Sequence, residues 1–307
     1  MVANNHYIGC IYHDDASRLW YNVSGSGEKT ERGWLPMILT LKVENAAGEV
    51  LAKHVGTDGA TLVYAGAYQP GDRIVLEADS PGGYLIAALE DSIAPAYVYM
   101  GGLRHVMTVP FGEKCVCYSP RSFSGEGHLL SVRRATRREV GAYKNVALNP
   151  LDCHENEILF PHSRANVETR GESVFASRNA VDGIYANAGH GPWPYQSWGI
   201  NRDPDAKMTI DFGRAVFIDR AVLTTRADFP HDSWWVSGAL VFSDGSAVTF
   251  PLTKTERPQI VEFAPRTATW VALERLIKAD DESPFPALSQ IEIWGAEAGC
   301  DPQIAGG

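Results

Sequence analysis

Short apolar segments recur about every ten residues along most of this chain, and turn-forming residues separate them. The segments are rich in Val, Ile, Tyr and Leu, while Gly, Pro, Asn and Asp cluster between them. Strands joined by such short connections pair antiparallel, because a parallel pair needs a crossover of about a dozen residues or more. The pattern therefore predicts an all-β protein made of two antiparallel, jelly-roll-like β-sandwich domains.

In the first half, the expected strands cover residues 7–12, 38–43, 50–54, 61–64, 73–78, 84–89, 97–100, 105–109 and 114–118. The best candidate for a short helix is 135–143, and 145–161 is typical of a connector that carries the turn signal Asn149-Pro150. We therefore expect one domain over residues 1–150 and a second over residues 151–307. The role of the first domain is not indicated by its sequence.

The second half carries the clearest hairpin signal. Two apolar segments, 239–243 and 246–250, flank Asp244-Gly245, a two-residue turn that favours residues able to adopt positive φ. Further strands are expected over residues 208–212, 218–224, 259–263, 269–276 and 289–294. The spacing leaves no room for crossover helices, so the pairing here is again expected to be antiparallel.

Charge and composition exclude some partners. The 307 residues include 37 acidic and 27 basic ones, for a net charge of −10, which argues against nucleic acid and anionic membranes as partners. No segment approaches the roughly 18 unbroken apolar residues of a membrane span, and no signal peptide is recognisable. The five cysteines are odd in number and scattered, which favours a reduced, cytoplasmic protein. The sequence does not indicate an oligomeric state.

Two loops combine aromatic rings with charged side chains: residues 190–203 (HGPWPYQSWGINRD) and residues 226–235 (RADFPHDSWW). Trp and Tyr in a loop need either a core to cover them or a ligand to stack on. We expect the two loops to form the rim of one ligand pocket. The candidate ligand-binding residues are His190, Trp193, Tyr195, Arg202, Arg226, His231, Asp232, Trp234 and Trp235. One of the adjacent Trp234 and Trp235 should point inward if they continue a strand.

A series of short motifs runs through the second half in a fixed order. They are ASR at 176–178, NAVDG at 179–183, the Trp198 region, MTIDFG at 208–213, FSDG at 242–245, PRTA at 265–268 and LSQIEIWG at 288–295. In this order they resemble a discoidin domain (coagulation-factor C-type) of the kind found in carbohydrate-binding modules, over roughly residues 160–296. The resemblance implies a galactose-binding-like, eight-stranded sandwich with ligand loops at one end. It also implies that Trp198 lies in the core, because this fold usually carries a core aromatic residue there. The first half resembles no known family.

The resemblance also implies a structural calcium ion, or a similar hard cation, bound mainly by oxygen atoms. Its ligands would be the Asn179 and Ile184 carbonyls, the Asp182 carboxylate, Asn187, the Ser289 carbonyl and Gln290. The departure from the family pattern is Gln290, where Glu is usual, and it removes one negative charge. The alternative is that Asp182-Gly183 is simply a turn.

The residue types in the two loops suit a carbohydrate. A pyranose ring has an apolar face that stacks on an aromatic ring, and its hydroxyls match Arg, His, Asp and Asn. Arg can also bind the carboxylate of a uronide bidentately, so a uronide or a galactose-type glycan is expected.

Two alternatives remain open at this stage. One is an intracellular enzyme that acts on a sugar or glycoside between the two domains, with His190 or the His231-Asp232 pair as acid/base. No paired carboxylates or nucleophile motif at diagnostic spacing supports it, so no catalytic residue is assigned. The other is a protein-interaction module. In its lipid-binding form, Phe229-Pro230 would be the exposed apolar tip, which the acidic net charge disfavours.

Overall fold

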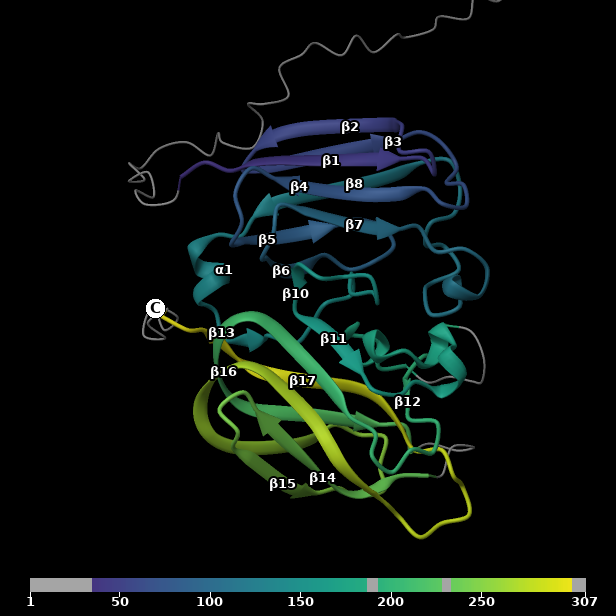
Figure 1. The fold of residues 1–307 in the computed structure, drawn as a ribbon, viewed down its shortest axis with the longest axis vertical. Coiled ribbons are helices and arrows are strands. Elements are labelled where there is room, and N and C mark those ends of the chain that lie inside the picture. The colour runs from purple at the N-terminus through teal and green to yellow at the C-terminus, as the bar shows by residue number, and fades with distance from the viewer. Residues whose placement is uncertain (1–34, 187–192, 228–232, 300–307) are drawn as a thin grey trace, which may run out of the picture. The chain divides into compact units, whose positions relative to one another are not determined.

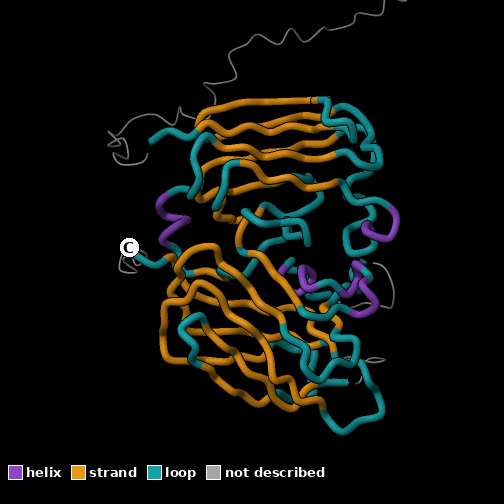
Figure 2. The backbone as a smooth tube through the Cα atoms, viewed as in Figure 1, coloured by secondary structure: helices purple, strands orange, loops and turns teal. Residues whose placement is uncertain are grey.

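The protein is described by a computed structural model, which covers residues 35–186, 193–227 and 233–299. Almost all of its regular structure is β-strand, and helices are few and short (Figure 2). Every strand pair is antiparallel. The predicted all-β class is therefore confirmed. The strand expected over residues 7–12 lies outside the described residues.

The first sandwich consists of two sheets, with strand orders β2-β1-β4-β7 and β10-β6-β5-β8-β3 (Figure 1). The strands are β1 (Ile38–Glu44), β2 (Val50–Thr57), β3 (Gly59–Tyr64), β4 (Arg73–Ala78), β5 (Gly83–Ala88), β6 (Ala96–Met100), β7 (Arg104–Thr108), β8 (His128–Arg134) and β10 (Leu159–Phe160). Buried and half-buried residues alternate along β5 and β6, so one face of these strands packs inward. Their buried side chains meet those of β1 and β4 in one hydrophobic core.

The predicted helix is present as α1 (Arg137–Gly141), which is shorter than the 135–143 expected. Thr136 and Glu139 form a capping box, in which each side chain accepts a hydrogen bond from the other's backbone N–H.

The prediction of a strand over 114–118 is wrong. The chain forms the 3-10 helix η2 (Gly112–Cys115) and then a turn, while β8, which was not predicted as a separate strand, pairs with β3 and β5. The alternation of Cys, Val and Tyr imitates a strand here. Pro110 and the positive φ of Gly112 instead start a turn, and the Cys115 thiol lies 3.0 Å from the Pro110 carbonyl oxygen.

The second sandwich is a single eight-stranded sheet folded over its own core. Its main strand order is β12-β17-β13-β16-β14-β15, and β11 and β9 add to β13 and β17. The strands are β9 (Lys144–Asn145), β11 (His162–Ala165), β12 (Trp198–Gly199), β13 (Met208–Thr225), β14 (Trp235–Phe242), β15 (Ala247–Pro251), β16 (Gln259–Lys278) and β17 (Ala287–Glu297). The predicted hairpin is confirmed, with Gly245 at φ 81° in the turn between β14 and β15.

Two pairs of predicted strands are continuous in the structure. Residues 208–212 and 218–224 both belong to β13, and 259–263 and 269–276 both belong to β16. The register between β13 and β16 breaks between Asp211 and Val216, where Gly213 adopts φ 63°. A bend at this point lets one strand serve both layers of the sandwich, because glycine tolerates the left-handed conformation without strain.

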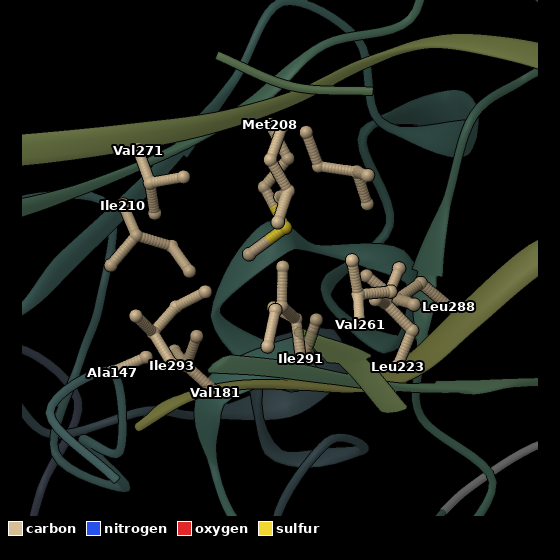
Figure 3. Close-up of a cluster of buried hydrophobic side chains, with 14 of the residues drawn as sticks. Ala147, Val181, Met208, Ile210, Leu223, Val261, Val271, Leu288, Ile291 and Ile293 are labelled. Atoms are coloured by element: carbon tan, nitrogen blue, oxygen red, sulfur yellow. The ribbon is translucent and has the colours of Figure 1, made fainter. Parts of the chain in front are cut away.

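The core of the second sandwich is filled by aliphatic side chains from facing strands. Met208 and Ile210 of β13, Val271 of β16 and Ile293 of β17 lie together there (Figure 3). Trp198 and Trp235 are also buried in this core, at 0% and 1% exposure. The expectation for Trp198 is thus confirmed, and Trp235 is the inward member of its pair.

The segment between the sandwiches pairs with both of them. β9, which lies before the predicted boundary near residue 150, pairs with β17 of the second sandwich, whereas β10, which lies after it, pairs with β6 of the first sandwich. A hydrogen bond adds a second link: Tyr97 of β6 donates to the buried Glu297 carboxylate of β17, which Arg214 of β13 also binds bidentately, at 2.7 and 3.0 Å. In the described ranges, no helix is long and apolar enough to span a membrane.

Candidate functional site

A cavity of about 460 Å³ opens at one end of the second sandwich, where β13 ends and β17 begins. Its lining comes from four segments: the 3-10 helices η3 (Thr169–Gly171) and η4 (Ser173–Phe175), residues 195–201, Arg226, and residues 285–287. The sheet brings these segments together. Gly199 of β12 pairs with Ala287 of β17, and the Arg226 N–H donates to the Ala287 carbonyl at 2.8 Å.

Three aromatic rings contribute to the cavity wall: Phe175, Tyr195 and Phe285. The rings of Phe175 and Tyr195 meet edge to face, with centroids 6.2 Å apart. Phe285 is 40% exposed, and the guanidinium of Arg202 lies 4.3 Å from its ring centroid. The wall therefore offers apolar ring faces from three separate parts of the chain.

Arg226 is buried beneath this wall and fixes the position of Tyr195. Its Nη1 donates to the Tyr195 carbonyl oxygen at 2.6 Å, and its guanidinium lies 3.6 Å from the Tyr195 ring centroid. A desolvated cation over an aromatic face contributes about 2 kcal/mol. The two predicted loops therefore converge at this pair.

The polar part of the lining includes one ion pair and one hydroxyl without a partner. Arg170 binds Glu172 bidentately at 2.6 and 2.7 Å, and this hydrogen bonding holds the pKa of Glu172 below its ordinary value. The Ser197 hydroxyl is fully buried and has no hydrogen-bond partner within the described residues. An unsatisfied buried hydroxyl beside a cavity is available to a bound molecule.

The tryptophans that were expected at the rim lie elsewhere. Trp193 and Trp234 are half-buried and do not line the cavity, and the backbone N–H of Trp193 donates to the Val116 carbonyl of the first sandwich at 2.8 Å. Trp235 points into the core, because it starts a strand whose alternation turns Val236 outward. Arg202 is exposed beside Phe285.

The candidates His190, His231 and Asp232 fall outside the described residues, as does Phe229-Pro230.

Of the lining residues that carry an aromatic ring or a charge, four were not predicted: Arg170, Glu172, Phe175 and Phe285. For Phe285 a signal was present, because it lies between Pro284 and Pro286, the same proline-flanked aromatic pattern that marks Trp193. For the other three residues, only the fold brings η3 and η4 to this end of the sandwich.

The atoms expected to hold a cation do come together, around the side chain of Gln290. Its Nε2 donates to the Asn179 carbonyl at 2.6 Å, to Asp182 Oδ1 at 2.7 Å and to the Ile184 carbonyl at 3.2 Å. Its Oε1 accepts from the Gly183 N–H at 2.9 Å, which fixes the orientation of the amide.

This arrangement does not fit a cation, because an N–H donor faces the oxygens that would bind it. Burial raises the pKa of the Asp182 carboxyl to about 6, although the nearby Arg178 opposes this shift. Ser289 is buried beside Gln290, and Asn187 lies outside the described residues. Calcium binding by this chain stays a prediction.

No protein-family model and no curated protein matches this chain. Among solved structures, it is similar to chitosan-binding module 1 of a chitosanase/glucanase from Paenibacillus sp. IK-5, with 18% identity over 49% of this chain and 98% of that one, at a TM-score of 0.35. It is also similar to the lectin domain of lectinolysin complexed with Lewis B antigen (17% identity, 50% and 97% coverage, TM-score 0.38).

A third similar structure is the family 32 carbohydrate-binding module of C. perfringens NanJ in complex with galactose. It shares 14% identity over 43% of this chain and 91% of that one, at a TM-score of 0.33. Similarity at these identities and TM-scores assigns neither a family nor a ligand to the chain.

Proposed function

We propose that the cavity at the end of the second sandwich binds one pyranose ring of a glycan. The observation that carries this proposal is the combination, in one cavity of about 460 Å³, of three aromatic rings with the buried Ser197 hydroxyl, which has no partner among the described residues. An apolar sugar face stacks on such rings, and its hydroxyls bond to the polar groups between them. The volume lies within the roughly 300–1,000 Å³ typical of small-molecule sites.

The charges of the lining favour an acidic sugar over a neutral one. Arg170 and Arg226 contribute two positive charges and Glu172 one negative charge, so the described lining is net positive. A single added ion pair at a solvent-accessible site contributes up to about 1 kcal/mol, or about a fivefold gain in affinity. We therefore propose that a galacturonide binds more tightly than the matching galactoside, from which it differs only at the carboxylate.

Isothermal titration calorimetry with this matched pair of sugars tests the proposal. Phe285→Ala removes one ring of the wall, and an aromatic contact of about 1–1.5 kcal/mol corresponds to about a tenfold loss of affinity. Phe217→Ala is the control, because Phe217 is 41% exposed, nearly the same as Phe285 at 40%, but lies on β13 away from the cavity lining. Equal affinities in the two variants, or no binding by the native protein, would refute the proposal.

An enzymatic role draws no support from this geometry. Glycoside hydrolysis by the common mechanism uses two carboxyl groups about 5–9.5 Å apart. Within the described lining, Glu172 is the only carboxylate, and it is paired with Arg170. We therefore propose binding without assigning a reaction.

A further inference from the structure

A second, smaller hollow lies on the outer surface of the second sandwich. Its volume is about 220 Å³, and it is lined by Arg164 of β11, Lys207, Thr209 and Asp211 on and before β13, and Trp270 of β16. None of these residues lines the larger cavity. The two hollows are therefore separate sites.

The strand registers place the lining side chains on one face of the sheet. Arg164 lies directly opposite Thr209, and Trp270 lies directly opposite Asp211. Thr209 and Asp211 are two residues apart and half-buried, whereas Met208, Ile210 and Phe212 between and beside them are buried. Opposed residues in antiparallel strands point to the same face, with Cβ atoms about 4.5–5.5 Å apart. The tryptophan and the arginine therefore flank a floor made of Thr209 and Asp211.

The polar groups of this hollow are only partly satisfied by the protein. The side chain of Arg164 is exposed and makes no hydrogen bond or ion pair with the described residues. Asp211 uses Oδ1 to accept from the Gly213 N–H at 2.8 Å, and no bond within the described residues uses its Oδ2. Lys207 forms a salt bridge to Glu274 at 3.3 Å, at the edge of the hollow.

We infer that this hollow binds a single uronate ring, a sugar that carries a carboxylate. The apolar face of the ring stacks on the half-buried indole of Trp270, and its carboxylate pairs with the free guanidinium of Arg164. Its hydroxyls bond to Thr209 and to the open oxygen of Asp211. Lys207 is already paired with Glu274, so the guanidinium of Arg164 is the cation of the lining that is available to the carboxylate. A volume below the roughly 300 Å³ of drug-sized sites limits the occupant to one ring.

The test uses tryptophan fluorescence, since Trp270 lines this hollow and no tryptophan within the described residues lines the larger cavity. Full-length protein is titrated with methyl glucuronide and with methyl glucoside. We expect a saturable fluorescence change with the glucuronide, and an affinity at least about fivefold lower for the glucoside, because one charge-assisted hydrogen-bond pair is lost. Trp270→Phe should abolish the signal while calorimetry still detects binding.

Arg164→Ala should weaken glucuronide binding at this site at least about fivefold without changing stability, since the side chain is exposed and unpaired. Arg138→Ala on α1 is the matched control, because Arg138 is also exposed and makes no bond within the described residues. Phe285→Ala should leave the fluorescence titration unchanged, because Phe285 lines the larger cavity and not this hollow. A failure of the larger cavity to bind sugar can therefore be distinguished from a failure of this hollow. The inference is overturned by a titration without signal, by equal affinity for the two sugars, or by an Arg164→Ala protein that binds as the native one does.

Discussion

Replacing Gln290 by glutamate should turn a self-contained hydrogen-bond network into a calcium-dependent one. In the native protein, Gln290 Nε2 donates to three oxygens, at 2.6, 2.7 and 3.2 Å, and the side chain is 2% exposed. Gln290→Glu keeps the shape and the acceptor for the Gly183 N–H, but places a carboxylate oxygen where the donor was. Four oxygens then face one another.

The loss of unfolding free energy expected for Gln290→Glu follows from these contacts. Removing the donor leaves three acceptor oxygens without their N–H partner, which at about 1 kcal/mol each amounts to about 3 kcal/mol. The new carboxylate also lies beside Asp182, whose pKa is already raised to about 6 by burial, so protonating Asp182 at about pH 7 costs only about 1 kcal/mol more. The variant should therefore lose about 3–4 kcal/mol of unfolding free energy when calcium is chelated. At about 2–4 °C per kcal/mol, Tm falls by about 6–16 °C.

Calcium should restore most of this loss in the variant, because four facing oxygens including two carboxylates form a site suited to a hard cation. Free calcium at about 100 times its Kd returns about 2.7 kcal/mol. The assay is thermal unfolding with and without calcium, followed by the fluorescence of the buried Trp198 and Trp235. Gln290→Met is the control, since it loses the hydrogen bonds and gains no oxygen. A native protein stabilised by calcium, or a Gln290→Glu protein indifferent to it, would contradict this reasoning.

Three further changes have definite expected outcomes. Burial, with a contribution from Asp91, raises the pKa of Glu90 to about 7. The contribution of Glu90 to the free energy of unfolding is therefore complete below about pH 4.5 and is lost as the pH rises through about 7. In urea unfolding across that range, Glu90→Gln should remove up to about 3 kcal/mol of the decline in stability. Arg214→Met leaves the buried Glu297 carboxylate without its cation and should cost about 3–5 kcal/mol in the same assay; a loss below about 1 kcal/mol would show that the pair does not stabilise the fold. Ser197→Ala removes a hydroxyl that has no hydrogen-bond partner among the described residues, so the free energy of unfolding should stay within about 0.5 kcal/mol of the native value. Sugar affinity, measured by calorimetry, should fall about threefold to tenfold. Unchanged affinity would exclude this hydroxyl from the site.

Local patterns predicted the strands well where one face of each strand is buried. The strand expected over 97–100 matches β6 (Ala96–Met100), along which buried and half-buried residues alternate, and Asp244-Gly245 identified its hairpin because a tight turn demands those residues. The continuity of β13 was not predictable, because a bend at Gly213 within one ladder looks in sequence like a break between two strands. The wrong strand over 114–118 has a related cause: alternation alone does not show which segment finds a partner in the sheet.

The lining of the candidate cavity could be read from the sequence only in part. Of the residues proposed from the two aromatic loops, Tyr195 and Arg226 meet beside the cavity. Sequence alone does not show which rings turn inward, so Trp235 was assigned to a ligand although it fills the core. Phe175 reaches the cavity through the path of η4, which depends on tertiary packing rather than on any local pattern.

The most direct measurement of the central claim is a crystal structure of the protein with a galacturonide. The account predicts a pyranose ring in the cavity lined by Phe175, Tyr195 and Phe285, with one of its hydroxyls within hydrogen-bond distance of Ser197 Oγ. A cavity that stays empty of sugar at saturating galacturonide, or a sugar bound only elsewhere on the molecule, would contradict it.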